Sequence, residues 1–305
     1  MGFQDALYLQ DIPYCSDEAV EFADRSMELI SYNAIYASTE LAKERGSYES
    51  FDGSLWSKGI LPKDSIEILE ENRGKEYLNV DRSETLDWKS LRKKVKKDGM
   101  RNSNVMAIAP TATISNITGV TQSIEPTYQN LYVKSNLSGE FTIVNPHLVR
   151  KLKELDLWDD VMINDLKYFE GSLSEISRIP DEIKKLFSTA FEVEPRYIVE
   201  SASRRQKWID QAQSLNVFVP ADSNKKYIHD IHYSAWKKGV KSLYYCRSQS
   251  IQRAETGSSD EAQNKEEKKE TVQIKEDTKK TKTLDEMVAE SGNNDDDYDE
   301  CLSCQ

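Results

Sequence analysis

The sequence predicts an α/β protein with a parallel sheet, followed by a polar C-terminal tail. Two observations predict the sheet. The apolar run 105–109 ends at a proline, which suits a strand covered on both faces, and helical and extended patterns alternate from 201 to 245. The tail is predicted because no aromatic residue lies between Tyr245 and Tyr298, and because 16 Asp and Glu against 8 Lys and Arg give residues 250–305 a net charge of −8.

Helix signals are clearest in the first hundred residues. Ser16 is suited to cap a long amphipathic helix that Gly46 ends, and Asp87 is suited to begin a second helix that ends at Gly99. Residues 58–62, between these helices, are predicted to form a loop. The apolar face of the long helix consists of Val20, Ala23, Met27, Ile30, Ala34, Ala37 and Leu41. We expect this face to pack in the protein core rather than to bind a partner.

The second half of the chain predicts further alternation. Residues 145–191 have helical spacing of their apolar side chains. Helices are then expected at 201–215 and 223–238, and strands at 216–219 and 240–245. This order is typical of βα units that build a parallel sheet.

Composition favours a cytoplasmic protein. The 249 residues before the tail are enough for one sizeable core. No apolar run approaches the roughly 20 residues that span a bilayer, and no basic-then-apolar leader is found. Four cysteines do not form a secreted disulfide framework. The net charge of −12 and the absence of a long basic run argue against duplex nucleic acid as the main partner. We expect no membrane and no nucleic-acid partner.

Cys301 and Cys304 form a Cys-x-x-Cys pair at the end of the tail. A dithiol on a flexible linker with a reach of roughly 40 Å can pass two electrons to a disulfide elsewhere by thiol–disulfide exchange. The alternatives are half of a zinc site or two idle thiols. Zinc needs about four ligands, whereas Cys15 and Cys246 are isolated and the tail has no histidine. The redox interpretation is therefore favoured.

Three more patterns have both a functional and a structural interpretation. A hydroxyl-rich loop just past the predicted strand could hold a phosphate on its backbone N–H groups, or could be an ordinary turn; it consists of Pro110, Thr111, Ala112, Thr113, Ile114 and Ser115. Tyr244 and Tyr245 would face opposite sides of a strand as core and surface aromatics, or could relay an electron with a coupled proton. His229 and His232 share a helix face, but without a third ligand a packed or solvated pair is favoured over a metal site.

Several segments, running in the same order over essentially the whole chain, together resemble the C-terminal portion of the large, catalytic subunit of class I ribonucleotide reductase. The resemblance is carried by residues 1–8, 58–62, 101–103, 110–115, 119–126, 207–211, 214–216 and 239–245 and by Cys301 and Cys304. It implies the latter part of a ten-stranded α/β barrel made of two antiparallel halves of parallel strands, over 1–249. A flexible acidic linker over 250–300 and a redox-active tail over 301–305 would follow.

The resemblance also implies roles for the site residues. Residues 110–115 match the loop that holds the diphosphate of a ribonucleoside diphosphate. Tyr244 and Tyr245 match a stacked pair that carries the radical from the small subunit towards the active-site cysteine. Cys301 and Cys304 match the dithiol that re-reduces the active-site disulfide and is itself reduced by thioredoxin or glutaredoxin. No cofactor is expected on this chain, because the resemblance places the radical cofactor in the small subunit.

One departure from the family changes the expected function. The radical-bearing cysteine, its neighbouring glutamate and asparagine, and the substrate-reducing cysteine pair cannot be assigned, since neither Cys15 nor Cys246 occupies a matching position. We therefore expect an oxidoreductase part that is inactive alone and complements a separate N-terminal fragment of the large subunit. The alternatives are a non-catalytic module that binds the small subunit or thioredoxin, and an incomplete gene model of the full subunit.

Overall fold

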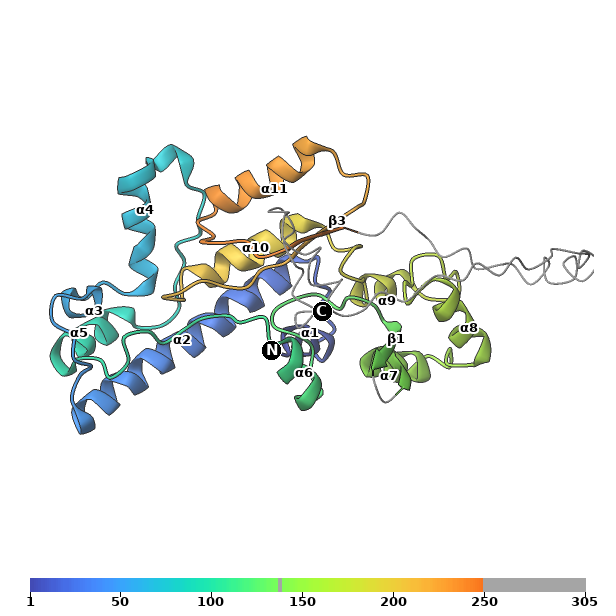
Figure 1. The fold of residues 1–305 in the computed structure, drawn as a ribbon, viewed down its shortest axis with the longest axis horizontal. Coiled ribbons are helices and arrows are strands. Elements are labelled where there is room, and N and C mark those ends of the chain that lie inside the picture. The colour runs from blue at the N-terminus through green and yellow to red at the C-terminus, as the bar shows by residue number, and fades with distance from the viewer. Residues whose placement is uncertain (137–138, 249–305) are drawn as a thin grey trace, which may run out of the picture. The chain divides into compact units, whose positions relative to one another are not determined.

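The computed structural model describes residues 1–136 and 139–248, and Figure 1 shows that helices are the main regular secondary structure of this part. The predicted linker and the terminal dithiol of Cys301 and Cys304 lie outside the described residues. In chain order the elements are α1 (Phe3–Tyr8), α2 (Asp17–Arg45), α3 (Leu55–Lys58), η1 (Pro62–Asp64), α4 (Ser65–Arg73), η2 (Lys75–Tyr77), α5 (Trp88–Asp98), α6 (Ala112–Thr118), β1 (Leu131–Asn136), β2 (Gly139–Val144), α7 (Pro146–Glu154), α8 (Asp160–Tyr168), α9 (Asp181–Leu186), α10 (Pro195–Gln206), β3 (Val217–Val219), α11 (Lys225–Lys237) and β4 (Cys246–Ser248).

The predicted ends of α2 are confirmed, but half of its predicted apolar face is wrong. The Ser16 hydroxyl accepts a hydrogen bond from the N–H of Ala19 at 3.1 Å, and Gly46 ends the helix with a φ of 80°. The face is buried as expected near the start of the helix. Further along, Ile30 is 53% exposed and Leu41 is 38% exposed. The side chains buried there instead are Ser31, Ile35, Ser38, Thr39 and Ala42.

The buried face differs because polar side chains of α2 find partners elsewhere in the chain. The Ser31 hydroxyl donates to the carbonyl of Trp208 at 2.5 Å. The Ser38 hydroxyl accepts from the N–H of Asn102 at 3.0 Å. A buried hydroxyl with a partner carries little penalty, whereas a hydropathy pattern assigns serine to the surface. The prediction failed for that reason.

Glu28 of α2 fixes the chain that enters α5. Its carboxylate accepts hydrogen bonds from the N–H groups of Thr85 (2.8 Å) and Leu86 (3.0 Å), the Thr85 hydroxyl (2.6 Å) and Nε1 of Trp88 (2.9 Å). Burial would raise the pKa of Glu28, but these hydrogen bonds outweigh burial and hold the pKa below its usual range. The predicted start of α5 is confirmed, since the Asp87 carboxylate caps the helix.

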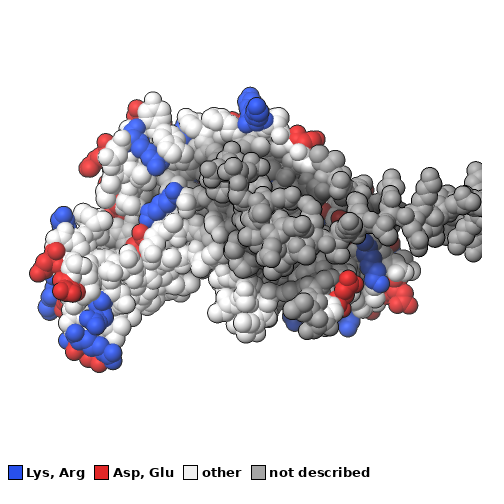
Figure 2. Space-filling view, viewed as in Figure 1, with Lys and Arg blue, Asp and Glu red and all other residues white. Residues whose placement is uncertain are grey.

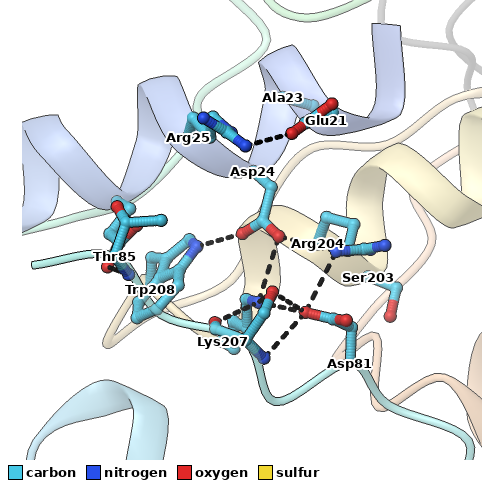
Figure 3. A network of polar contacts seen from close by, with 12 residues as sticks. Glu21, Ala23, Asp24, Arg25, Asp81, Thr85, Ser203, Arg204, Lys207 and Trp208 are labelled. Carbon is cyan, nitrogen blue, oxygen red and sulfur yellow. Dashed lines mark hydrogen bonds and ion pairs between the residues drawn. The ribbon is translucent and has the colours of Figure 1, made fainter. Parts of the chain in front are cut away.

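A network of ionic groups joins α2, α10 and the loop before α5 (Figure 3). Asp24 accepts from Nε1 of Trp208 at 2.6 Å, from Arg204 at 2.8 Å and from Nζ of Lys207 at 3.1 Å. Asp81, on the loop, accepts from the same Lys207 at 2.6 Å and lies 3.0 Å from Arg204. The side chain of Lys207 is 1% exposed, so its charge depends on these two carboxylates for compensation.

The network predicts a pH-dependent contribution to stability from Asp81. Burial would raise the pKa of Asp81, but hydrogen bonds from Lys207 and Ser83 lower that pKa to about 2. A folded-state pKa below the unfolded value stabilises the fold above pH ~4, and the contribution is lost as the pH falls to about 2. We expect Asp81→Asn to lower the free energy of unfolding by about 1–2 kcal/mol at pH ~7, and by progressively less on acidification, in urea titrations. The exposed Asp222 provides the matched control Asp222→Asn; equal losses from both variants would contradict the assignment.

The region 145–191 is helical as predicted over α7, α8 and α9, which are separated by turns and irregular chain and pack around their own apolar cluster. Leu148 and Leu152 of α7 are fully buried against α8 and α9, whereas Leu155, which follows α7, is exposed. The preceding hairpin of β1 and β2 was not predicted. Its antiparallel register runs from Leu131 opposite Val144 to Asn136 opposite Gly139. A hairpin with largely exposed side chains gives little apolar alternation for a sequence pattern to detect.

The predicted parallel pairing is confirmed, but two strand positions are wrong. β3 pairs in parallel with β4, which begins at Cys246, so the strand expected at 240–245 is irregular chain and the pairing comes later. Residues 105–109 form only one parallel bridge, from Ile108 to Gln213, and the run is half-exposed to exposed instead of covered on both faces. Apolar content alone therefore overstated both the regularity and the burial of these segments.

The remaining boundaries also differ in part from the prediction. The helix expected at 201–215 is α10, which begins earlier because Pro195 occupies its first turn. It ends at Gln206, and the chain beyond it turns before its backbone forms hydrogen bonds with Met106 and Ile108. α11 confirms the helix expected at 223–238. Residues 59–61 confirm the predicted loop, whereas its outer two residues belong to α3 and η1.

Within residues 1–136 and 139–248, no helix combines the length and the apolar character that crossing a bilayer requires.

Candidate functional site

The central segment, which we define as residues 209–217, lies between two of the predicted site segments. On one side, the N–H of Ile108 donates to the carbonyl of Ala212 at 3.2 Å. On the other side, the N–H of Tyr244 donates to the carbonyl of Leu215 at 2.8 Å. The chain that leads into the predicted phosphate loop and the chain that carries the tyrosines therefore flank one segment. In the sequence, these two site segments are more than 120 residues apart.

The predicted phosphate loop, residues 110–115, runs into the first turn of α6. Thr111 precedes the helix in the left-handed region, with a φ of 50°, and its hydroxyl accepts from the N–H of Ser123 at 2.8 Å. Ser115 is buried and donates its hydroxyl proton to a carbonyl of the same turn. Thr113 is exposed. The groups offered to a ligand are therefore the Thr113 side chain and the first-turn N–H groups, which have no acceptor within the helix.

Tyr244 and Tyr245 lie with their rings in contact. The ring centroids are 4.1 Å apart with an interplanar angle of 51°, and the side chains are 48% and 42% exposed. The expectation that a strand would send them to opposite faces is wrong, because residues 240–245 do not form a regular strand. Their backbone is nonetheless fixed, since the carbonyl of Tyr245 accepts from the N–H of Val217 at 2.8 Å.

A cavity of about 390 Å³ opens beside the tyrosine pair. Trp236 of α11 lines it together with Arg73, whose guanidinium lies 4.9 Å from the centre of the indole ring. Cys246 also lines the cavity and is exposed. The phenol rings are thus accessible from this side.

Lys241 and Asp210 hold the central segment in place, and sequence reasoning assigned them no role. Nζ of Lys241 donates to the carbonyls of Asp210 and Gln211, both at 2.9 Å. The Asp210 carboxylate accepts from the N–H groups of Val105 at 2.7 Å and Met106 at 2.9 Å. Both residues stood inside segments that carried the family resemblance, but no spacing rule indicates which backbone groups a side chain will bind.

Among the other candidate groups, Cys246 and His232 line the cavity beside the tyrosine pair, whereas Cys15 and His229 do not. Cys15 is half-buried and burial raises its thiol pKa; it forms no disulfide with Cys246. His229 stacks on Tyr233, and Nδ1 of His232 lies 2.8 Å from a backbone carbonyl of its own helix. Among the described residues, no three His, Cys, Asp or Glu side chains gather as metal ligands.

Comparisons with known proteins identify the family of the chain. A family model described as ribonucleotide reductase, barrel domain, matches residues 1–246. The chain is 61% identical over 250 residues to the ribonucleoside-diphosphate reductase subunit alpha of Chlamydia muridarum, covering 82% of this chain and 24% of that protein. It is 36% identical to the large subunit of Arabidopsis thaliana, covering 99% of this chain and 35% of that protein. The chain thus spans about a quarter to a third of the length of these curated relatives.

A solved structure shows the same relationship in three dimensions. The class Id ribonucleotide reductase alpha subunit of Actinobacillus ureae superposes with a TM-score of 0.62 at 25% sequence identity, covering 82% of this chain and 38% of that chain. The parallel strands, their connecting helices and this superposition define a protein of the α/β-barrel class. The chain belongs to the ribonucleotide reductase barrel-domain family, which confirms the resemblance inferred from the sequence.

Proposed function

We propose that this chain supplies the substrate-phosphate loop, the tyrosine relay and the mobile reductant of a ribonucleoside-diphosphate reductase, and that a separate polypeptide carries the rest of the large subunit. The observation that carries the proposal is the ring contact of Tyr244 and Tyr245, with centroids 4.1 Å apart, beside the same central segment that binds the chain leading into the phosphate loop. The proposed architecture is the latter part of a ten-stranded barrel, and the reaction is proposed to be cytoplasmic, where thiols stay reduced.

The proposed chemistry assigns each segment one step. The first-turn N–H groups of α6 and the Thr113 hydroxyl bind the diphosphate of a ribonucleoside diphosphate. An electron and a proton move from Tyr245 and Tyr244 in turn towards an oxidant in the small subunit, whose radical cofactor this chain does not bind. A cysteine thiol on the separate polypeptide then gives an electron and a proton to the oxidised tyrosine pair, and the thiyl radical formed in this way removes the 3′ hydrogen of the substrate.

The proposed reductant is the terminal dithiol. Two thiols beside the substrate deliver two electrons, the 2′ oxygen leaves as water, and those thiols become a disulfide. Cys301 and Cys304 reduce this disulfide by exchange and become a disulfide themselves, which thioredoxin or glutaredoxin then reduces. Because reacting groups must be held in near-attack geometry, neither polypeptide is expected to turn over alone.

Reconstitution tests the proposal. We would mix the full chain with the N-terminal part of a Chlamydia-type alpha subunit and a matching small subunit, and measure deoxycytidine diphosphate formed from cytidine diphosphate. Product is expected only when all three polypeptides are present. Product from this chain and the small subunit alone would contradict the proposal. Stable binding of the small subunit without any product would instead identify a non-catalytic binding module.

A further inference from the structure

Asn216 makes two hydrogen bonds at the point where the central segment enters β3. It is 4% exposed. Its Oδ1 accepts from the N–H of Tyr245 at 3.2 Å, and its Nδ2 donates to Oε1 of Glu125 at 2.6 Å. One buried amide therefore joins the backbone of the tyrosine pair to a carboxyl group from a distant part of the chain.

The segment that carries Glu125 is bound in turn to the phosphate loop. Nε2 of Gln122 donates to the carbonyl of Pro110 at 2.9 Å. The N–H of Ser123 donates to the Thr111 hydroxyl at 2.8 Å. The N–H of Glu125 donates to the carbonyl of Gln122 at 3.3 Å, which closes a turn between these contacts and the carboxyl group. Each link from the loop to Tyr245 is therefore a hydrogen bond of the described structure.

We propose that Glu125 and Asn216 are positioning residues that transmit a displacement of the phosphate loop to the tyrosine pair. The inference rests on the proposed function for the roles of those two segments. Asn216 is buried and Glu125 is half-buried, so a broken hydrogen bond would leave a partly desolvated donor and acceptor without a partner, at a cost in free energy. When the loop moves, the amide and the carboxyl group follow it instead of separating, and the backbone of Tyr245 follows the amide.

Burial strengthens this link at Glu125. Burial raises the pKa of the Glu125 carboxyl, while the hydrogen bond from Asn216 and the nearby charge of Arg247 oppose that rise. The carboxyl oxygen that binds Asn216 needs only to accept a hydrogen bond. A glutamine can do the same with its amide oxygen, whereas a leucine cannot. This difference provides the conservative variant for a test.

The test is a double-mutant cycle on the full chain with 3-fluorotyrosine placed at 245. The ¹⁹F chemical shift of that ring reports its surroundings without any catalysis. Thr111→Val removes the acceptor for Ser123, and we expect it to shift the resonance. In the Glu125→Leu background, the same substitution is expected to produce less than half that shift, whereas in the Glu125→Gln background the shift is retained. An equal shift in all three backgrounds, or no shift in the parent chain, would overturn the proposal.

Further variants separate a positioning role from general destabilisation. Asn145→Ala also removes a half-buried amide, which donates to Asn130 at 2.9 Å near α7, and the response to Thr111→Val is expected to be unchanged in that background. If Glu125→Leu does not fold, Asn216→Ala replaces it with the same expectation. Added inorganic pyrophosphate is expected to shift the resonance as well. A cycle that shows coupling without a pyrophosphate response would refute the phosphate role and still support the link.

Discussion

Tyr244→Phe and Tyr245→Phe are each expected to abolish nucleotide reduction in the reconstituted complex, with a loss in kcat of at least about a thousandfold, or ~4 kcal/mol in the activation barrier. Phenylalanine keeps the ring, and therefore the packing that places the two centroids 4.1 Å apart. It lacks the phenolic O–H that must lose an electron and a proton together. The measurement is deoxycytidine diphosphate formation at saturating substrate, with complex assembly followed by sedimentation.

A matched tyrosine elsewhere controls for the loss of a hydroxyl group. Tyr168 at the end of α8 is exposed, and Tyr168→Phe is expected to retain normal turnover and assembly. Normal turnover in either variant of the tyrosine pair would refute the relay. Loss of assembly in those variants would assign the tyrosines to an interface instead.

The second large effect concerns the terminal dithiol. Cys301→Ser or Cys304→Ser is expected to allow a first turnover from pre-reduced protein and to block the following turnovers with thioredoxin. A single remaining thiol can form a mixed disulfide but cannot resolve it by exchange. Rapid-quench measurement of product per complex checks this, with a burst of about one equivalent and almost no steady-state rate expected.

The tail itself contains the control for that experiment. Ser303 lies between the two cysteines, and Ser303→Ala keeps both thiols, so full steady-state activity is expected. A small dithiol such as dithiothreitol is expected to restore multiple turnovers to the serine variants, because it reduces the active-site disulfide directly. Unchanged steady-state activity in Cys301→Ser or Cys304→Ser would remove the shuttle role.

Helix ends were predictable because their determinants are local. Ser16, Gly46, Asp87 and Gly99 mark the ends of α2 and α5, and each acts through a hydrogen bond or a backbone angle within one turn of the helix. Parallel pairing was predictable from the alternation of elements. The family was also identifiable from the sequence, because many short segments occur in a fixed order, which local patterns alone would not show.

The tertiary structure alone decided which side chains meet. Ser31 is buried because the carbonyl of Trp208 faces it, and the tyrosine rings touch because their backbone lies against the central segment. Asn216 was visible in the sequence, but its partners Glu125 and Tyr245 lie 91 and 29 positions away. A sequence pattern measures apolar periodicity along one element. Hydrogen bonds between distant elements depend on the packed geometry, so burial of polar groups and the link between the two site segments appear only once the chain has folded.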